Sequence, residues 1–108
     1  MLRNTYILSN QKIISKLFTT GLKKTVKPLT LTTIPFDKNK VLFAVSKKHI
    51  PKAVERNKIK RQMHAIYFNN LELFLKEPTR AIALTYVSKS PTSFLDIKKS
   101  MTTLFSIM

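Results

Sequence analysis

The sequence has no cysteine, a single glycine and only five acidic residues in 108 positions. Without cysteine the chain can form neither a disulfide framework nor a thiolate metal site. Its two histidines, His49 and His64, are too few for a convincing metal cluster. One glycine rules out a glycine-rich phosphate loop. No apolar run approaches the roughly 20 residues that cross a bilayer, so we expect no membrane span.

The five carboxylates are scattered, and no two are spaced as an acid–base pair. They are Asp37, Glu55, Glu72, Glu77 and Asp96. Several fall at predicted turns or helix starts, where capping or the helix dipole accounts for them. We therefore predict no catalytic residue in this chain and no metal bound by the chain alone.

The 20 lysines and arginines leave a net charge of +15 on 12.5 kDa. Self-repulsion at that density weakens the compact state, which indicates a polyanionic partner. DNA, RNA and an anionic membrane all qualify, whereas solubility alone needs only about 2–8 charges. The length and the 44% hydrophobic content predict one folded domain, residues 1–108, rather than a disordered basic tail.

The first 36 residues contain no acid, a feature also found in transit peptides. This segment is, however, richer in lysine than in arginine, and it carries a helix and a strand signal. We predict that it belongs to the fold and that the protein is cytoplasmic.

Apolar periodicity predicts a first helix over residues 10–20, with Ser9 as its N-cap and Gly21 at a positive φ after its end. Residues 23–27 read as a basic connector. Apolar and threonine residues then alternate, which predicts a strand over residues 29–34.

In that strand Leu29 and Leu31 would face one side of the sheet and Thr30 and Thr32 the other. Residues 41–46 form a second predicted strand, which we expect to pair with the first as a hairpin.

Residues 47–61 hold seven lysines or arginines against one glutamate. Pro51 suits the first turn of a helix, which we predict over residues 52–68. This helix would have two faces. Its apolar stripe consists of Ile59, Met63 and Ile66, whereas its cationic face gathers Asn57, Lys60, Arg61 and His64, with Arg56 at the flank.

The last third of the chain predicts a break at Pro78, a buried central strand over residues 81–87 and a final helix. Ser93 and Asp96 match a capping box. The apolar face of this helix would contain Phe94, Ile97, Met101, Leu104, Phe105 and Met108. The predicted order is helix, strand, strand, basic helix, strand, helix, an α+β sandwich around a small sheet.

The cationic segment has too few acids for intrahelical ion pairs to explain it. A solvated helix face and a membrane-bound amphipathic helix are the other interpretations, but the latter would carry a longer apolar face. We favour binding to a nucleic-acid backbone, whose affinity falls steeply with salt. A structural ribosomal or general RNA-binding protein and a helical DNA-binding module remain alternatives.

These residues resemble the signature of the protein subunit of bacterial ribonuclease P, and the resemblance covers nearly the whole chain. The matching motifs are Ser46-Lys-Lys48, Lys52-Ala-Val54, Arg56-Asn-Lys-Ile-Lys-Arg61 and, in the first helix, Ile14-Ser-Lys-Leu-Phe18-Thr-Thr-Gly21.

The resemblance implies a small α/β sandwich of the ribosomal protein S5 domain 2-like type, with a left-handed crossover through the basic helix. Its partners would be the catalytic RNA subunit and the single-stranded 5′ leader of precursor tRNA, without an obligate protein partner. The RNA would perform the hydrolysis with Mg²⁺ bound mainly by RNA and substrate.

By position, the resemblance assigns two sets of residues. The RNA-binding set is Lys47, Lys48, Lys52, Arg56, Asn57, Lys58, Lys60, Arg61 and His64. The leader-cleft set is Ile14, Phe18, Thr30 and Thr32.

The chain also departs from the family pattern. Lys58 stands where arginine is usual, and His64 and Phe68 stand where further basic residues are common. Ile14 replaces an aromatic residue, and Thr32 a frequent tyrosine.

Overall fold

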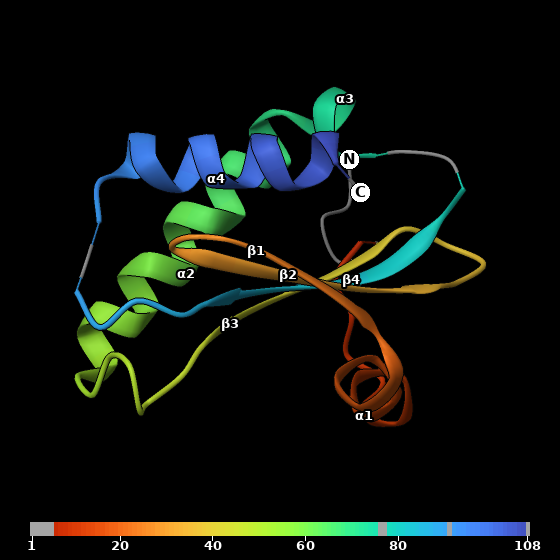
Figure 1. The fold of residues 1–108 in the computed structure, drawn as a ribbon, viewed down its shortest axis with the longest axis horizontal. Helices are drawn as coiled ribbons and strands as arrows, with labels where there is room; N and C mark the ends of the chain where they lie inside the picture. Colours follow the sequence, from red (N-terminus) through yellow and green to blue (C-terminus); the bar gives the residue numbers. More distant parts are fainter. Residues whose placement is uncertain (1–5, 76–77, 91, 108) are drawn as a thin grey trace.

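The computed structural model describes residues 6–75, 78–90 and 92–107. Four strands form one sheet, and three longer helices and one short helix cover it (Figure 1). In chain order the elements are α1 (Gln11–Thr20), β1 (Leu22–Val26), β2 (Leu29–Pro35), β3 (Lys40–Val45), α2 (Ala53–Asn69), α3 (Leu71–Phe74), β4 (Arg80–Tyr86) and α4 (Phe94–Ser106). Glu77 and Met108, named above, lie outside the described residues.

The sheet has the strand order β1-β2-β4-β3, so the strand predicted to be central is central. β2 is antiparallel to β1 and to β4, whereas β3 runs parallel to β4. Helix α2 connects this parallel pair. The S5-like type and the left-handed sense of the crossover stay predictions, whereas the α+β class is confirmed.

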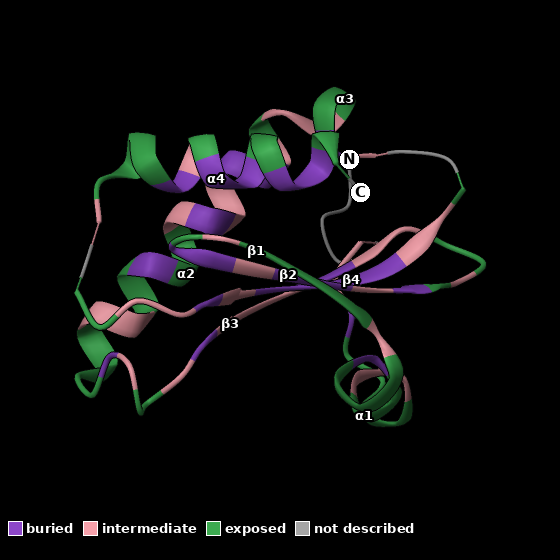
Figure 2. Cartoon of the chain, in the orientation of Figure 1, coloured by how far each residue is buried: buried purple, intermediate pink, exposed green. Residues whose placement is uncertain are grey.

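Helices α2 and α4 lie on one face of the sheet and α1 on the other (Figure 1). The larger core cluster fills the first interface and includes Leu31, Leu84, Met63 and Met101. A smaller cluster under α1 joins Leu17 to Ile34, Ala81 and Ala83. Figure 2 shows these buried inner surfaces as purple bands on the strands and helices.

The predicted hairpin between residues 29–34 and 41–46 is wrong. Both strands form, but β3 pairs with β4, in the register Val41↔Ile82. The strand that pairs with β2 on that side is β1, whose residues overlap the segment predicted as a connector. Four of the five β1 residues are exposed, so this edge strand shows no alternation of buried and polar residues in the sequence.

The start of α1 also differs by one residue from the prediction. Asn10, not Ser9, is the N-cap, and its Oδ1 accepts hydrogen bonds from the N–H groups of Lys12 (3.0 Å) and Ile13 (3.3 Å). At α2 the N-cap is Lys52, so Pro51 precedes the helix instead of lying in its first turn.

Gly21 does not adopt the predicted positive φ; its φ of −68° and ψ of 151° are extended. Glycine is required there for space. A Cβ atom would lie 2.6 Å from Cγ2 of Thr32 and against the carbonyl oxygen of Leu17. The end of α1 therefore rests directly on β2.

The cap of α4 is confirmed, because Oγ of Ser93 accepts a hydrogen bond from the N–H of Asp96 (3.1 Å). Phe94, predicted on the apolar face of this helix, is 45% exposed, since it lies at the first position, before the helix meets the sheet. Among the described residues, no helix combines the length and the hydropathy that a membrane span requires.

Candidate nucleic-acid interface

The turn between β3 and α2 presents two lysines on a fixed backbone. The carbonyl oxygen of Ser46 accepts hydrogen bonds from the N–H groups of His49 (3.1 Å) and Ile50 (3.0 Å), and its Oγ accepts one from Lys48 N–H (3.1 Å). Ile50 is buried in the main core. Lys47 and Lys48 are exposed on this anchored turn, so their charges are held near one place while their side chains remain in solvent.

Helix α2 separates its core residues from its cations as predicted. Ile59, Met63, Ile66 and Tyr67 are buried against the sheet and the neighbouring helices. Because a helix turns once in 3.6 residues, these four residues share one side of α2 and leave the opposite side to solvent. The exposed set contains Lys52, Asn57, Lys58, Lys60 and Arg61. We call these five residues, with Lys47 and Lys48, the cationic face.

Arg56 has a different role from the other cations. Its side chain is half-buried, and Nη1 donates hydrogen bonds to the carbonyl oxygens of Ile50 (3.0 Å) and Pro51 (2.6 Å). The guanidinium thus joins the first turns of α2 to the turn that carries Lys47 and Lys48. Sequence spacing places Arg56 at the flank, but it does not show that the guanidinium reaches back to carbonyl oxygens five and six residues earlier.

His64 borders the cationic face, next to Lys60 and Arg61, and its ring packs among aromatic residues. Its ring centroid is 4.5 Å from that of Phe68 and 5.8 Å from that of Phe43 on β3. It is partly buried there. The structure therefore places His64 at the border between α2 and the sheet edge.

The predicted cleft residues come from α1 and from the sheet face beneath it. Ile14 packs on the small core cluster, and Phe18, one turn further along, is 39% exposed. Thr30 is partly buried, and its Oγ1 lies 3.0 Å from Oγ1 of Thr25. Thr32 is only 1% exposed beneath Gly21, so it offers a ligand almost no surface.

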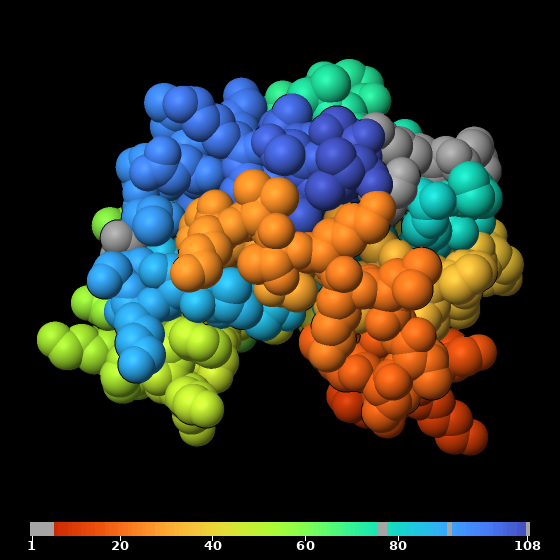
Figure 3. Space-filling model, viewed as in Figure 1, coloured from red at the N-terminus to blue at the C-terminus, as the bar shows by residue number. Residues whose placement is uncertain are grey.

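Two further residues of this sheet face lie in residues 23–27, which the sequence predicts as a connector and which the structure shows to belong mostly to β1. The register Lys23↔Thr32 and Thr25↔Thr30 places Lys23 and Thr25 beside the predicted cleft residues. Thr85 adjoins Thr30 on the other side. Figure 3 shows a hollow between α1 and the residues at the start of α2, with this strand region above it. The sheet face beside α1 is therefore rich in threonine and has a lysine on its edge strand.

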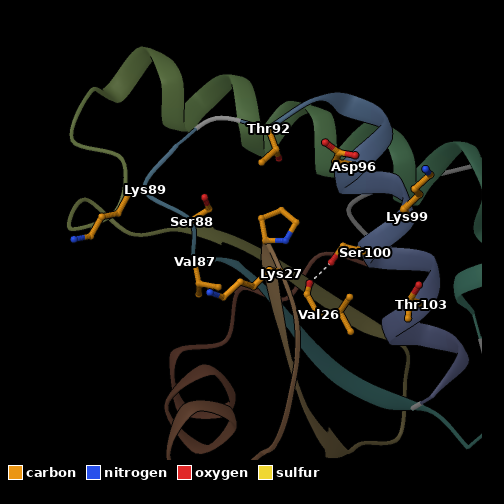
Figure 4. A pocket seen from close by; sticks show the side chains of 11 residues that line it. Val26, Lys27, Val87, Ser88, Lys89, Thr92, Asp96, Lys99, Ser100 and Thr103 are labelled. Carbon is orange, nitrogen blue, oxygen red and sulfur yellow. Dashed lines mark hydrogen bonds between the residues drawn. The ribbon is translucent and has the colours of Figure 1, made fainter.

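A second hollow, of about 580 Å³, lies between the β1–β2 turn and α4 (Figure 4). Lys27, Lys89 and Lys99 line it together with one acid, Asp96. The ammonium groups of Lys89 and Lys99 point away from its centre (Figure 4). Among the residues that the structure describes, no three His, Asp or Glu side chains are grouped as metal ligands.

Comparisons with known proteins point to one family. The family model described as Ribonuclease P matches residues 2–108. A curated protein of Chlorobium phaeobacteroides, named ribonuclease P protein component, is 40% identical over 76 residues; the match covers 63% of this chain and 52% of that protein. The chain thus matches about half the length of this relative.

Two solved structures share the fold. The RNase P protein of Staphylococcus aureus has a TM-score of 0.78 at 21% identity, with 94% of each chain covered. The RNase P protein of Thermotoga maritima has a TM-score of 0.80 at 18% identity, with 94% of this chain and 96% of that chain covered.

Proposed function

This chain belongs to the Ribonuclease P family, and on that premise we propose that it is the protein subunit of a ribonuclease P ribonucleoprotein. In this role it binds the catalytic RNA and the 5′ leader of precursor tRNA. The complex then removes the leader by endonucleolytic cleavage. The protein acts in the cytoplasm and needs no other protein partner.

The observation that carries this proposal is the cationic face. Six lysines and arginines of this face project from one anchored turn and one helix whose other side is packed into the core. Each cation that approaches a phosphate releases condensed counterions, so the face favours a polyanion. Because the scaffold fixes the positions of the charges, it also sets the register of the bound strand.

The leader is assigned to the hollow beside α1, between this helix and the start of α2 (Figure 3). Phe18 offers an exposed ring on which a base can stack, and the hydroxyl of Thr30 and the ammonium of Lys23 can contact sugar and phosphate. Thr32 is buried and supports these residues from below. Ile14, where the family has an aromatic residue, contributes packing and no stacking surface.

The chemistry of cleavage is assigned to the RNA. Mg²⁺ supplies charge stabilisation in phosphoryl transfer and is usually held through carboxylates and phosphates. The described residues contain no cluster of carboxylate ligands, so they do not fit a dedicated Mg²⁺ site. In this proposal RNA and substrate hold the metal, and the protein binds and orients both RNAs.

Reconstitution tests the proposal. The purified protein should restore 5′ cleavage of precursor tRNA by its cognate RNA subunit at low Mg²⁺. A variant with alanine at Lys58, Lys60 and Arg61 should restore much less at the same protein concentration. No restoration by the unmodified protein, together with ribosomal RNA as the dominant co-purifying species, would contradict the proposal.

A further inference from the structure

A groove of about 380 Å³ lies between β3 and α2, beside the cationic face. Val41 and Phe43 of β3 form part of one wall, and Lys60, Arg61 and His64 of α2 form the other. Its volume falls in the range of roughly 300–1,000 Å³ that small-molecule sites occupy. The groove therefore combines an apolar wall with two cations of the proposed RNA interface.

Two of the residues that line this groove, Phe43 and His64, carry rings, and His64 stands where the family pattern has a further basic residue. His64 is in ring contact with Phe43 and with Phe68, at centroid distances of 5.8 Å and 4.5 Å. All three residues are partly exposed. Bases stack on such side chains without regard to sequence, because every base has a π face.

The backbone of β3 adds polar groups to the same wall. Val41 uses the outer edge of β3, donating to the carbonyl oxygen of Tyr6 (2.7 Å) and accepting from Leu8 N–H (2.9 Å). Main-chain groups of alternate residues in a strand point to the same edge, so those of Phe43 also point outward. No hydrogen bond among the described residues uses them. They offer one donor and one acceptor, the pair that a nucleobase edge requires.

We propose that this groove takes an unpaired nucleobase from the RNA that the cationic face binds. The base would lie against Phe43 and His64, its edge toward the main chain of Phe43 and its phosphate toward Lys60 and Arg61. A paired base cannot enter, since both its faces and its edge are occupied. A second copy of this chain is disfavoured, because each copy carries a charge of +15. The inference rests on the proposed function.

The test uses a single-stranded RNA decamer with a central 2-aminopurine, and the same decamer annealed to its complement. Single-strand binding to the unmodified protein should change the 2-aminopurine emission. His64→Gln and Phe43→Leu should each weaken this binding by about fivefold to a hundredfold, the loss of one stacked base. The same two substitutions should change the affinity for the duplex by less than twofold. Leu73→Ala, which changes an exposed residue of α3, is the matched control. It should change neither the affinity for the single strand nor that for the duplex.

The two proposals fail differently. If Lys60→Ala and Arg61→Ala weaken binding but His64→Gln and Phe43→Leu do not, the groove inference is overturned and the RNA interface stands. If none of the four changes affects binding, the interface itself is wrong.

A photo-crosslinking measurement avoids variants that fold poorly. The unmodified protein is irradiated with a decamer carrying 5-iodouridine at its centre, and the attached peptide is identified by mass spectrometry. Attachment at Phe43 or His64 supports the groove. Attachment exclusively outside the groove overturns it.

Discussion

Ile59 and Lys60 are neighbours in the sequence but have opposite environments. Ile59 is 2% exposed in the main core, and Lys60 is exposed on the cationic face. Ile59→Ala should lower the free energy of unfolding by about 2–5 kcal/mol, because it removes buried methyl groups and leaves a cavity. Lys60→Ala should change it by less than about 0.5 kcal/mol. Urea denaturation measures both, and a reversed order would show that the two faces of α2 are assigned backwards.

Gly21 allows a separate prediction, because the structure leaves no space there for a Cβ atom, whereas its φ angle suits any residue. Alanine there would bring its Cβ against the Leu17 carbonyl and within 2.6 Å of Thr32 Cγ2. We expect Gly21→Ala to lower the stability by about 1–3 kcal/mol through this overpacking. Ser15→Ala, an exposed change in the same helix, is the control. Equal melting temperatures for the two variants would contradict the close contact of α1 with β2.

Tyr67 gives a prediction about pH. Burial raises the pKa of its hydroxyl above the usual value of about 10, and Tyr6 contributes a smaller rise. The hydroxyl makes no hydrogen bond among the described residues. Below about pH 10 both the folded and the unfolded state hold the proton. Above it the unfolded chain ionises first, so the stability falls with rising pH.

Tyr67→Phe should remove this component of the alkaline loss. Urea denaturation at about pH 8.5 and about pH 11 should therefore show a smaller decrease for Tyr67→Phe than for the unmodified protein. At about pH 8.5 the variant should be at least as stable as the unmodified protein, because the substitution removes a buried hydroxyl that has no hydrogen-bond partner among the described residues. An equal alkaline decrease in both proteins would contradict the burial of this group.

At the scale of elements, α2 and the turn before it act as one unit because Arg56 connects them. Arg56→Ala removes hydrogen bonds to Ile50 and Pro51 and frees the turn that carries Lys47 and Lys48. We expect a stability loss of about 1 kcal/mol and a larger loss of RNA affinity than for Lys58→Ala, which removes one charge only. Denaturation and fluorescence anisotropy measure the two effects. Equal RNA affinities of the two variants would show that Arg56 acts only as a charge.

Elements with a strong local pattern were predictable from the sequence. The alternation in β2, the apolar run of β4 and the stripe of Ile59, Met63 and Ile66 each identify the element and its buried face. The edge strand β1 was not predictable, because only Val26 is partly buried there. The β3–β4 pairing joins residues about forty positions apart, and local patterns say nothing of such partners.

The candidate site divides in the same way. The exposed lysines and arginines of the cationic face follow from helical spacing. The burial of Thr32 under Gly21 and the contact of His64 with Phe43 depend on how distant segments pack, and the contacts of Arg56 depend on how the chain turns just before α2. Sequence position predicts Arg56, Thr32 and His64 as binding residues. In the structure each of them is partly or fully buried by its neighbours.

At the scale of the whole molecule, the radius of gyration of 12.9 Å matches the value of about 13 Å for a folded domain of this length. The charge of +15 is therefore carried by a compact body and not by an extended tail. Its highest density along the sequence, at residues 47–61, falls on a turn and a helix that the core holds in place. In the proposed function these charges act together on one RNA strand.

The salt dependence of binding between the purified protein and single-stranded RNA tests this claim most directly. If about five cations engage phosphates, the slope of log K against log salt concentration is about −3.5. Alanine at Lys58, Lys60 and Arg61 together should bring the slope to about −1.4, since each lost contact removes about 0.7. A slope that is the same for the unmodified protein and this variant would contradict the account.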